Sequence, residues 1–180
     1  MLTFRYVRWK NLLSTGNYFT EIKLDNNTNT LVVGENGSGK STMLDALCFG
    51  LFGKAFRSVN KPNLLNSINA KDCVVEVEFD SNNKSYKIVR GIKPNVFEIY
   101  CDNELLNQDA AARDYQEYLE KFILKLNYKS FTQIVILGSA SFVPFMQLSS
   151  SDRRAIIEDL LDIQIFSAMN GLLKDRLTNN

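Results

Sequence analysis

Hydrophobic and polar residues alternate along the N-terminal part of the chain with the period of two that is typical of β-strands. Residues 2–10 interleave aromatic and β-branched side chains with basic ones, and residues 18–24 alternate more loosely. A third stretch, residues 28–33, ends in the apolar run Leu31-Val32-Val33. The pattern therefore predicts three strands, and the third leads directly into a glycine-rich segment.

A second block of alternation predicts a β-hairpin. Residues 73–79 present one apolar face, a turn follows at residues 81–83, and residues 86–92 form the return strand. Residues 96–101 add a further strand. Because short connections join neighbouring antiparallel strands, the region 72–106 is expected to form an antiparallel β subdomain.

Helical periodicity predicts two helices in the first two thirds of the chain. Residues 41–52 are apolar on almost every side, which indicates a deeply buried helix, and Gly53 is a suitable residue to end it. Residues 110–126 carry a single apolar stripe, which is typical of a helix that packs on one side.

The C-terminal third is predicted to be mostly helical. Ser149, followed three residues later by Asp152, indicates a helix start, and the pattern runs to about residue 162. A second helical stretch covers residues 165–177. The short apolar run 134–137 fits a buried strand.

The glycine-rich segment carries the chemistry. Residues 34–41 read G-x-x-x-x-G-K-S between a predicted strand and a predicted helix, which is the P-loop pattern in its required context. Backbone N–H groups freed by glycine cradle phosphate oxygens, Lys40 reaches the β- and γ-phosphates, and the Ser41 hydroxyl ligates Mg²⁺. The segment therefore predicts binding of a nucleotide and Mg²⁺ by Asn36, Gly37, Ser38, Gly39, Lys40, Ser41 and Thr42.

The composition of the chain excludes several classes of function. The formal net charge is +1, so any contact with DNA must use a local patch or a partner chain. Because the chain has no histidine, general acid–base catalysis by histidine and metal sites with histidine ligands are both excluded. Its three cysteines are scattered, as expected for reduced thiols in a cytoplasmic protein. No apolar run reaches membrane-spanning length and no signal-peptide pattern is present, so no membrane association is expected.

Hydrolysis also needs an acidic residue at the end of a buried strand, to hold Mg²⁺ and polarise water. Residues 74–80 end in an aspartate, but Glu76 and Glu78 make this stretch half-exposed. The run 134–137 ends in Gly138. The chain is therefore predicted to hold half of an ATP site.

The loop 54–71 carries a modest number of basic residues. Two interpretations of it stay open: a solvated surface loop and a loop that contacts DNA.

Five segments in this order resemble the N-terminal lobe of the SMC-like DNA-repair ATPases of the SbcC type. Within that family they are most similar to the phage subset, the large subunits of the T-even recombination endonucleases. The segments are Trp9 to Ser14, Gly34 to Gly53, Lys93 to Ile99, Ser130 to Gly138 with Pro144 to Met146, and Asp152 to Leu161. The resemblance covers essentially the whole chain.

The resemblance implies an α/β P-loop NTPase fold, an ABC-type ATPase head lobe with a mixed sheet, a buried P-loop helix and an antiparallel β subdomain. Residues 1–163 would form the ATP-binding lobe, and residues 164–180 a truncated helix leading toward a coiled coil. Asn11 and Ser14 would lie near the adenosine. The chain would act as an ATPase only within the complete head, because the acidic strand and the signature motif belong to the other lobe.

The family also implies partners. These are the C-terminal half of the same head, a second copy in an ATP-sandwich homodimer, an SbcD-type metallo-nuclease subunit and double-stranded DNA ends, in bacterial or phage-infected cytoplasm. ATP-driven head dimerisation would control the nuclease. One position departs from the family: the glutamine that contacts Mg²⁺ and the γ-phosphate aligns with Ser139, a weak candidate metal ligand.

Three functional hypotheses follow from the sequence. The leading one is the ATP-binding lobe of a DNA-end-processing machine. The second is a free-standing P-loop kinase or GTPase, which would need a complete acidic strand within this chain. The third is a non-hydrolysing nucleotide-binding module that organises DNA, and the Ser139 departure keeps it open.

Overall fold

A computed structural model describes residues 2–106, 112–136 and 143–161, together with the single positions 163, 165, 169, 173 and 176. The chain forms two compact units, residues 1–116 and 117–180, which are described separately below. The expected domain boundary after residue 163 falls where few positions are described, and it stays a prediction.

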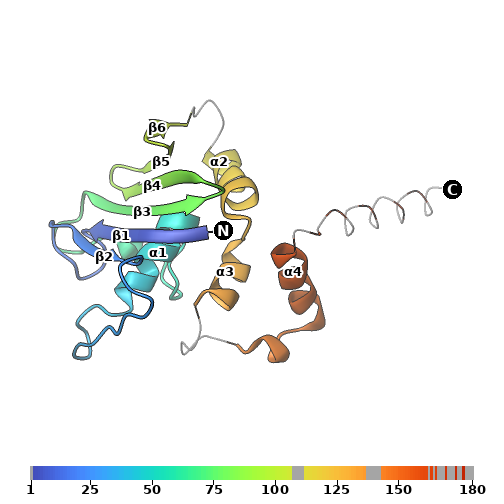
Figure 1. Cartoon of the computed structure of the whole chain (residues 1–180). Helices are drawn as coiled ribbons and strands as arrows, with labels where there is room; N and C mark the ends of the chain where they lie inside the picture. Colours follow the sequence, from blue (N-terminus) through green and yellow to red (C-terminus); the bar gives the residue numbers. More distant parts are fainter. Residues whose placement is uncertain are drawn as a thin grey trace. The chain divides into compact units, whose positions relative to one another are not determined.

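The first unit is built on a six-stranded sheet in the order β2-β1-β3-β4-β5-β6 (Figure 1). The strands are β1 (Leu2–Lys10), β2 (Thr20–Lys23), β3 (Cys73–Ser81), β4 (Lys84–Ile92), β5 (Val96–Cys101) and β6 (Glu104–Leu105). The predicted hairpin region is confirmed. Asn82 and Asn83 both have positive φ, at 52° and 61°, as a tight two-residue hairpin turn requires.

Helix α1 (Thr42–Phe52) packs against the apolar face of this sheet. The contact is close because Gly50 lacks a side chain: a Cβ there would lie 2.5 Å from Val77 Cγ2 and 3.2 Å from Val75 Cγ1. The helix ends at Gly53, which has φ 69° and donates its N–H to the Phe49 carbonyl at 2.9 Å. The predicted buried helix and its terminal glycine are therefore confirmed.

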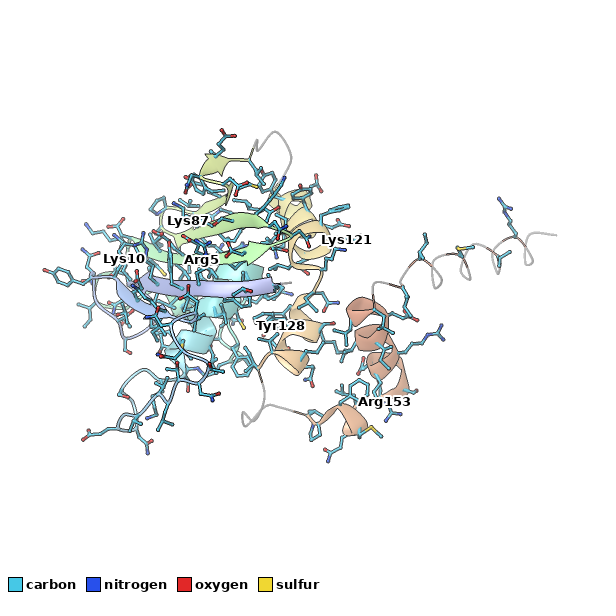
Figure 2. All side chains as sticks on the ribbon, viewed as in Figure 1. Arg5, Lys10, Lys87, Lys121, Tyr128 and Arg153 are labelled. Carbon is cyan, nitrogen blue, oxygen red and sulfur yellow. The ribbon has the colours of Figure 1, made fainter. Side chains whose placement is uncertain are left out.

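The opposite face of the sheet is charged. Arg8 donates to Glu76 at 2.8 Å, and the Nη1 of Arg8 lies 3.8 Å from Glu21, so three neighbouring strands share one charge network. Figure 2 labels Arg5 and Lys10 on β1 and Lys87 on β4, all from this sheet. Lys87 lies over the ring of Tyr100 at 4.6 Å. The alternation along each strand thus separates an apolar face from a polar one.

The structure corrects the third predicted strand. Residues 28–33 form no strand, and Leu31 and Val33 are 87% and 81% exposed. All pairings among the described strands are antiparallel, so the expected mixed sheet is not formed by these residues. The physical reason is that a strand exists only where another strand takes its backbone hydrogen bonds, however suitable its side chains are.

The second unit is helical. Helix α2 (Ala112–Tyr118) begins in the first unit and continues as the π-helical turn η2 (Leu119–Leu124), which ends at Lys125 with φ 55°. Helices α3 (Tyr128–Ile134) and α4 (Ser150–Leu160) contact each other, and Lys129 pairs with Asp152 between them. The predicted start of α4 is confirmed, because Ser149 Oγ accepts the Asp152 N–H at 3.1 Å.

In this unit one predicted element, a strand, is wrong, and another, the last helix, stays a prediction. The apolar run at 134–137 is not a strand: Ile134 ends α3, Val135 and Ile136 follow in a turn and bend, and position 137 lies outside the described residues. The side chain of Asn127 caps α3 by accepting the Ser130 N–H, so a local signal upstream decides for helix. The described residues that precede α4 contain the 3₁₀ turn η3 (Phe145–Gln147). The helix at 165–177 lies mostly outside the described residues.

Candidate nucleotide-binding site

Glycines shape the loop that precedes α1. Gly37 and Gly39 have φ 89° and 92°, in the region that residues with side chains rarely adopt. A Cβ on Gly34 would lie 2.5 Å from Ser38 Oγ, so a side chain there would force the Ser38 hydroxyl to move. The loop is further held by a hydrogen bond from the Ser38 N–H to the Glu35 carbonyl at 3.2 Å. The backbone therefore adopts the tight curve that the motif requires, although the strand before it is absent.

Lys40 lies across this loop. Its Nζ donates to the backbone carbonyls of Gly34 at 2.6 Å and Glu35 at 2.7 Å, so the ammonium is held against the start of the loop. Ser41 is the N-cap residue of α1, and its side chain makes no capping hydrogen bond. A cation and a hydroxyl thus stand together at the positive end of a buried helix dipole, which suits an anion and its metal.

A pocket of about 540 Å³ opens beside the loop. The predicted residues that line it are Ser14, Asn36, Gly37, Gly39, Lys40, Ser41 and Thr42. Ser38 does not line the pocket, and Ser139 lies outside the described residues. The volume falls within the range of small-molecule sites.

Asn11, expected near the adenosine, is not part of the pocket lining. Its side chain is buried, where it donates to Asn17 at 2.9 Å and to the Asp72 carbonyl at 3.2 Å, and accepts from Asn69 at 2.7 Å. All of its polar atoms are therefore used within the protein.

Arg57, in the predicted basic loop 54–71, also lines the pocket, and its side chain is 48% exposed. It donates to the buried Asp45 carboxylate from its backbone N–H at 3.0 Å, from Nε at 2.8 Å, and from Nη2. Asp45 belongs to the first turn of α1, so the loop after the helix is tied back beside the P-loop. The lining thus includes two cationic side chains, Lys40 and Arg57, and no described carboxylate.

A second arginine holds the other end of α1. Arg90 on β4 donates to the Gly50 carbonyl at 3.0 Å, and its guanidinium lies 3.7 Å from the centre of the Phe97 ring. It also donates to Gln116 Oε1 at 2.6 Å, while Gln116 Nε2 donates to the Leu51 carbonyl at 3.1 Å. The last turn of α1 contains no basic residue, so Arg90 supplies the cation that its negative dipole end favours.

A family model described as "AAA domain" matches residues 7–177. The chain belongs to the AAA domain family. This match extends over both compact units of the chain, and it includes the P-loop and all six strands from the middle of β1 onward.

Curated relatives of this AAA domain are phage and bacterial nuclease subunits. The chain is 46% identical over 171 residues to "Exonuclease subunit 2" of Escherichia phage RB69, covering 95% of this chain and 30% of that protein. It is 47% identical over 168 residues to the protein of the same name from Enterobacteria phage T4, covering 93% and 30%. The SbcC component of the SbcCD nuclease of Staphylococcus aureus is 30% identical, with coverage of 86% and 17%. The chain therefore spans less than a third of each of these proteins.

Solved structures support the fold. A structure from work on ATP-driven dimerisation of SMC ATPases has a TM-score of 0.57 at 22% identity and covers 88% of this chain and 99% of its own. The Smc head domain of Pyrococcus yayanosii has a TM-score of 0.56 at 19% identity, covering 99% and 36%. The predicted P-loop NTPase fold and the resemblance to an N-terminal SbcC-type ATPase lobe are confirmed. In the described part of the chain, no helix has the length and hydropathy needed to cross a membrane.

Sequence reasoning missed part of the pocket of this AAA domain. Leu13, Arg57, Asn63, Leu65 and Ser67 also line it. Leu13 comes from the loop after β1 and Arg57 from the loop after α1. Asn63, Leu65 and Ser67 lie in or just after η1 (Lys61–Leu64). Leu13 lies within the family-like segment Trp9 to Ser14, but no sequence motif marks the other four residues, which the fold brings to the P-loop.

Proposed function

We propose that this chain is the ATP-binding N-terminal half of an ATPase subunit in a complex that processes DNA double-strand ends during recombination. The observation that carries the proposal is the pocket in which Lys40, Ser41 and Thr42 stand at the start of a buried helix. In this role the backbone N–H groups around Gly37 and Gly39 and the ammonium of Lys40 bind the phosphates. Ser41 would ligate Mg²⁺, which would screen the charge of the bound phosphates.

The exposed run at residues 31–33 supports a composite head. Leu31 and Val33 are apolar and largely exposed, directly before the P-loop. Burial of such side chains is favourable by about 1.5–3 kcal/mol each. We infer that the C-terminal half of the same head supplies the strands that pair with residues 28–33, together with the acidic residue that hydrolysis needs.

The partners follow from the same proposal. Two heads bind two ATP molecules between them, and a metallo-nuclease subunit of the SbcD type acts on DNA ends under the control of this closure. The nuclease names of the relatives and the SMC-type fold support this assignment. The expected place of action is the cytoplasm of a bacterium or of a phage-infected cell.

The test is the variant Lys40→Ala, with ATP and Mg²⁺ binding measured by calorimetry. Loss of the phosphate-binding cation should lower ATP affinity about a hundredfold, because charge-assisted hydrogen bonds to phosphate are stronger than neutral ones. The control is Lys84→Ala in the β3–β4 hairpin, which should bind ATP as the parent chain does. Unchanged affinity in Lys40→Ala would count decisively against the site.

A further inference from the structure

Two loops of the first unit are joined by one buried side chain. Asn66 donates both protons of its amide, to the Leu13 carbonyl and to the Thr15 carbonyl, each at 3.0 Å. Its Oδ1 accepts the N–H groups of Ile68 and Asn69, each at 2.9 Å. The side chain of Asn66 therefore connects the loop after β1 to the loop that follows η1.

The backbone of Asn66 adds to the same connection. Its N–H donates to the Asn11 carbonyl at 2.9 Å, and its own carbonyl accepts the Ala70 N–H at 2.9 Å. Nearby, the Leu13 N–H donates to the Leu64 carbonyl at 2.7 Å. Asn66 is buried, and each of its polar groups is used, so a substitution there leaves several partners unsatisfied.

The joined loops form one wall of the pocket. Leu13 and Ser14 line it from the first loop, and Leu65 and Ser67 line it from the second, on either side of Asn66 in the sequence. Asn66 itself does not line the pocket. The wall thus presents two leucine side chains and two serines, with no charge.

The backbone of this wall is strained where it meets the pocket. Leu13 has φ 54°, in the left-handed region that is unfavourable for a residue with a branched, bulky side chain. Such a conformation persists only where the surrounding structure enforces it. The hydrogen bonds that enforce it here are those of the Leu13 N–H to Leu64 and of the Leu13 carbonyl to Asn66.

We propose that Asn66 is a positioning residue that holds Leu13 and Leu65 as the wall for the nucleoside part of a bound nucleotide. This inference rests on the proposed function of the site. The P-loop backbone, Lys40 and Arg57 supply the groups that suit phosphate, which leaves the uncharged wall for an aromatic base and its ribose. Apolar side chains contact the faces of a base, and serine hydroxyls serve its polar edge or the sugar.

The test separates the two halves of the ligand. Calorimetry compares Mg²⁺–ATP with inorganic tripolyphosphate, which carries the phosphates without a nucleoside. Asn66→Asp keeps the acceptor for Ile68 and Asn69 but sets a carboxylate against the carbonyls of Leu13 and Thr15. We expect ATP affinity to fall about tenfold and tripolyphosphate affinity to stay within about twofold of the parent chain.

A control variant tests for a general effect of added charge, and a second variant removes a wall side chain directly. Asn103→Asp makes the same charge change in the β5–β6 turn, where φ is 69° and aspartate is tolerated, and should alter neither affinity. Leu13→Gly removes the wall side chain while relieving the left-handed backbone, so the fold is preserved. It should lower ATP affinity severalfold and leave tripolyphosphate affinity unchanged.

The outcomes distinguish this inference from the proposed function. If ATP and tripolyphosphate affinities fall in parallel in Asn66→Asp and Leu13→Gly, or if neither changes, Asn66 does not position a nucleoside wall. If the parent chain binds both ligands and only Lys40→Ala abolishes both, the site is correct and this inference alone is overturned. If the parent chain binds neither ligand, the proposed function and this inference are both overturned.

Discussion

Arg57 and Asp45 form an ion pair in which the acid is fully buried and the base is half exposed, with side-chain exposures of 0% and 48%. The pair joins the first turn of α1 to the loop that follows the same helix. Because Arg57 also lines the pocket, the buried carboxylate determines where one of the two pocket cations stands. A single side chain on the inner face of the P-loop helix thus affects both stability and the charge of the site.

Replacing the buried acid should therefore destabilise the chain. Asp45→Asn keeps the shape but removes the charge that balances Arg57, and we expect a loss of about 1–3 kcal/mol in the free energy of unfolding. The estimate is below that for a fully buried pair because Arg57 reaches solvent. Urea unfolding followed by circular dichroism measures the change. Asp25→Asn, in an exposed turn, is the control, and equal stability of the two variants would contradict the structural role of the pair.

Gly53 offers a second test at the other end of α1. An alanine there would have to adopt φ 69°, and its Cβ would lie 3.0 Å from Arg90 Nη1. Gly53→Ala should lower the free energy of unfolding by about 1–2 kcal/mol. In the matched substitution Gly16→Ala the new Cβ meets no atom within 4 Å, so the change should stay within about 0.5 kcal/mol. Similar losses of stability in both variants would show that neither the positive φ nor the contact with Arg90 requires glycine at position 53.

The three cysteines should differ sharply in reactivity. Burial, with a smaller contribution from the nearby Asp45, raises the pKa of the Cys48 thiol from 9.0 to about 12, and burial raises the pKa of the Cys73 thiol to about 12 as well. Cys101 is half-exposed. A thiol reagent at pH 8 should therefore label Cys101 rapidly and the other two only after unfolding, because the thiolate is the reactive form. Rapid labelling of three thiols per folded chain would be inconsistent with this packing, and Cys101→Ser identifies the reactive site.

The same two thiols make stability depend on alkaline pH. A folded-state pKa that is raised to about 12 from 9.0 contributes stability that is complete below pH 9 and is lost as the pH rises toward 12. Urea midpoints measured between pH 8 and pH 11 should fall. The fall should be smaller in the double variant Cys48→Ala, Cys73→Ala, and an equal fall would assign the effect to other groups.

The chain by itself should not turn over ATP. Hydrolysis needs a carboxylate near the γ-phosphate, and the described pocket lining contains none. Phosphate release by the pure chain should therefore remain at the level of Lys40→Ala. Robust release that Lys40→Ala abolishes would instead favour a free-standing kinase or GTPase.

Elements with local signals were predictable from the amino-acid sequence. They are the glycines and Lys40 of the P-loop, the buried helix that ends at Gly53, and the β3–β4 hairpin. In each case the deciding chemistry lies within a few residues: a positive φ that favours glycine, an apolar helix surface, or alternation about a tight turn. These elements place the phosphate-binding part of the candidate site.

The other features depend on contacts between distant parts of the chain. Residues 28–33 have the side chains of a strand but no strand to pair with, since backbone pairing depends on a neighbour that the local sequence does not specify. The pairing of Arg57 with Asp45 and the hydrogen bonds of Asn66 join residues that periodicity does not relate. Side chains with ordinary local propensities acquire these roles because the sheet and α1 bring distant loops to one pocket, and that arrangement is a property of the folded chain.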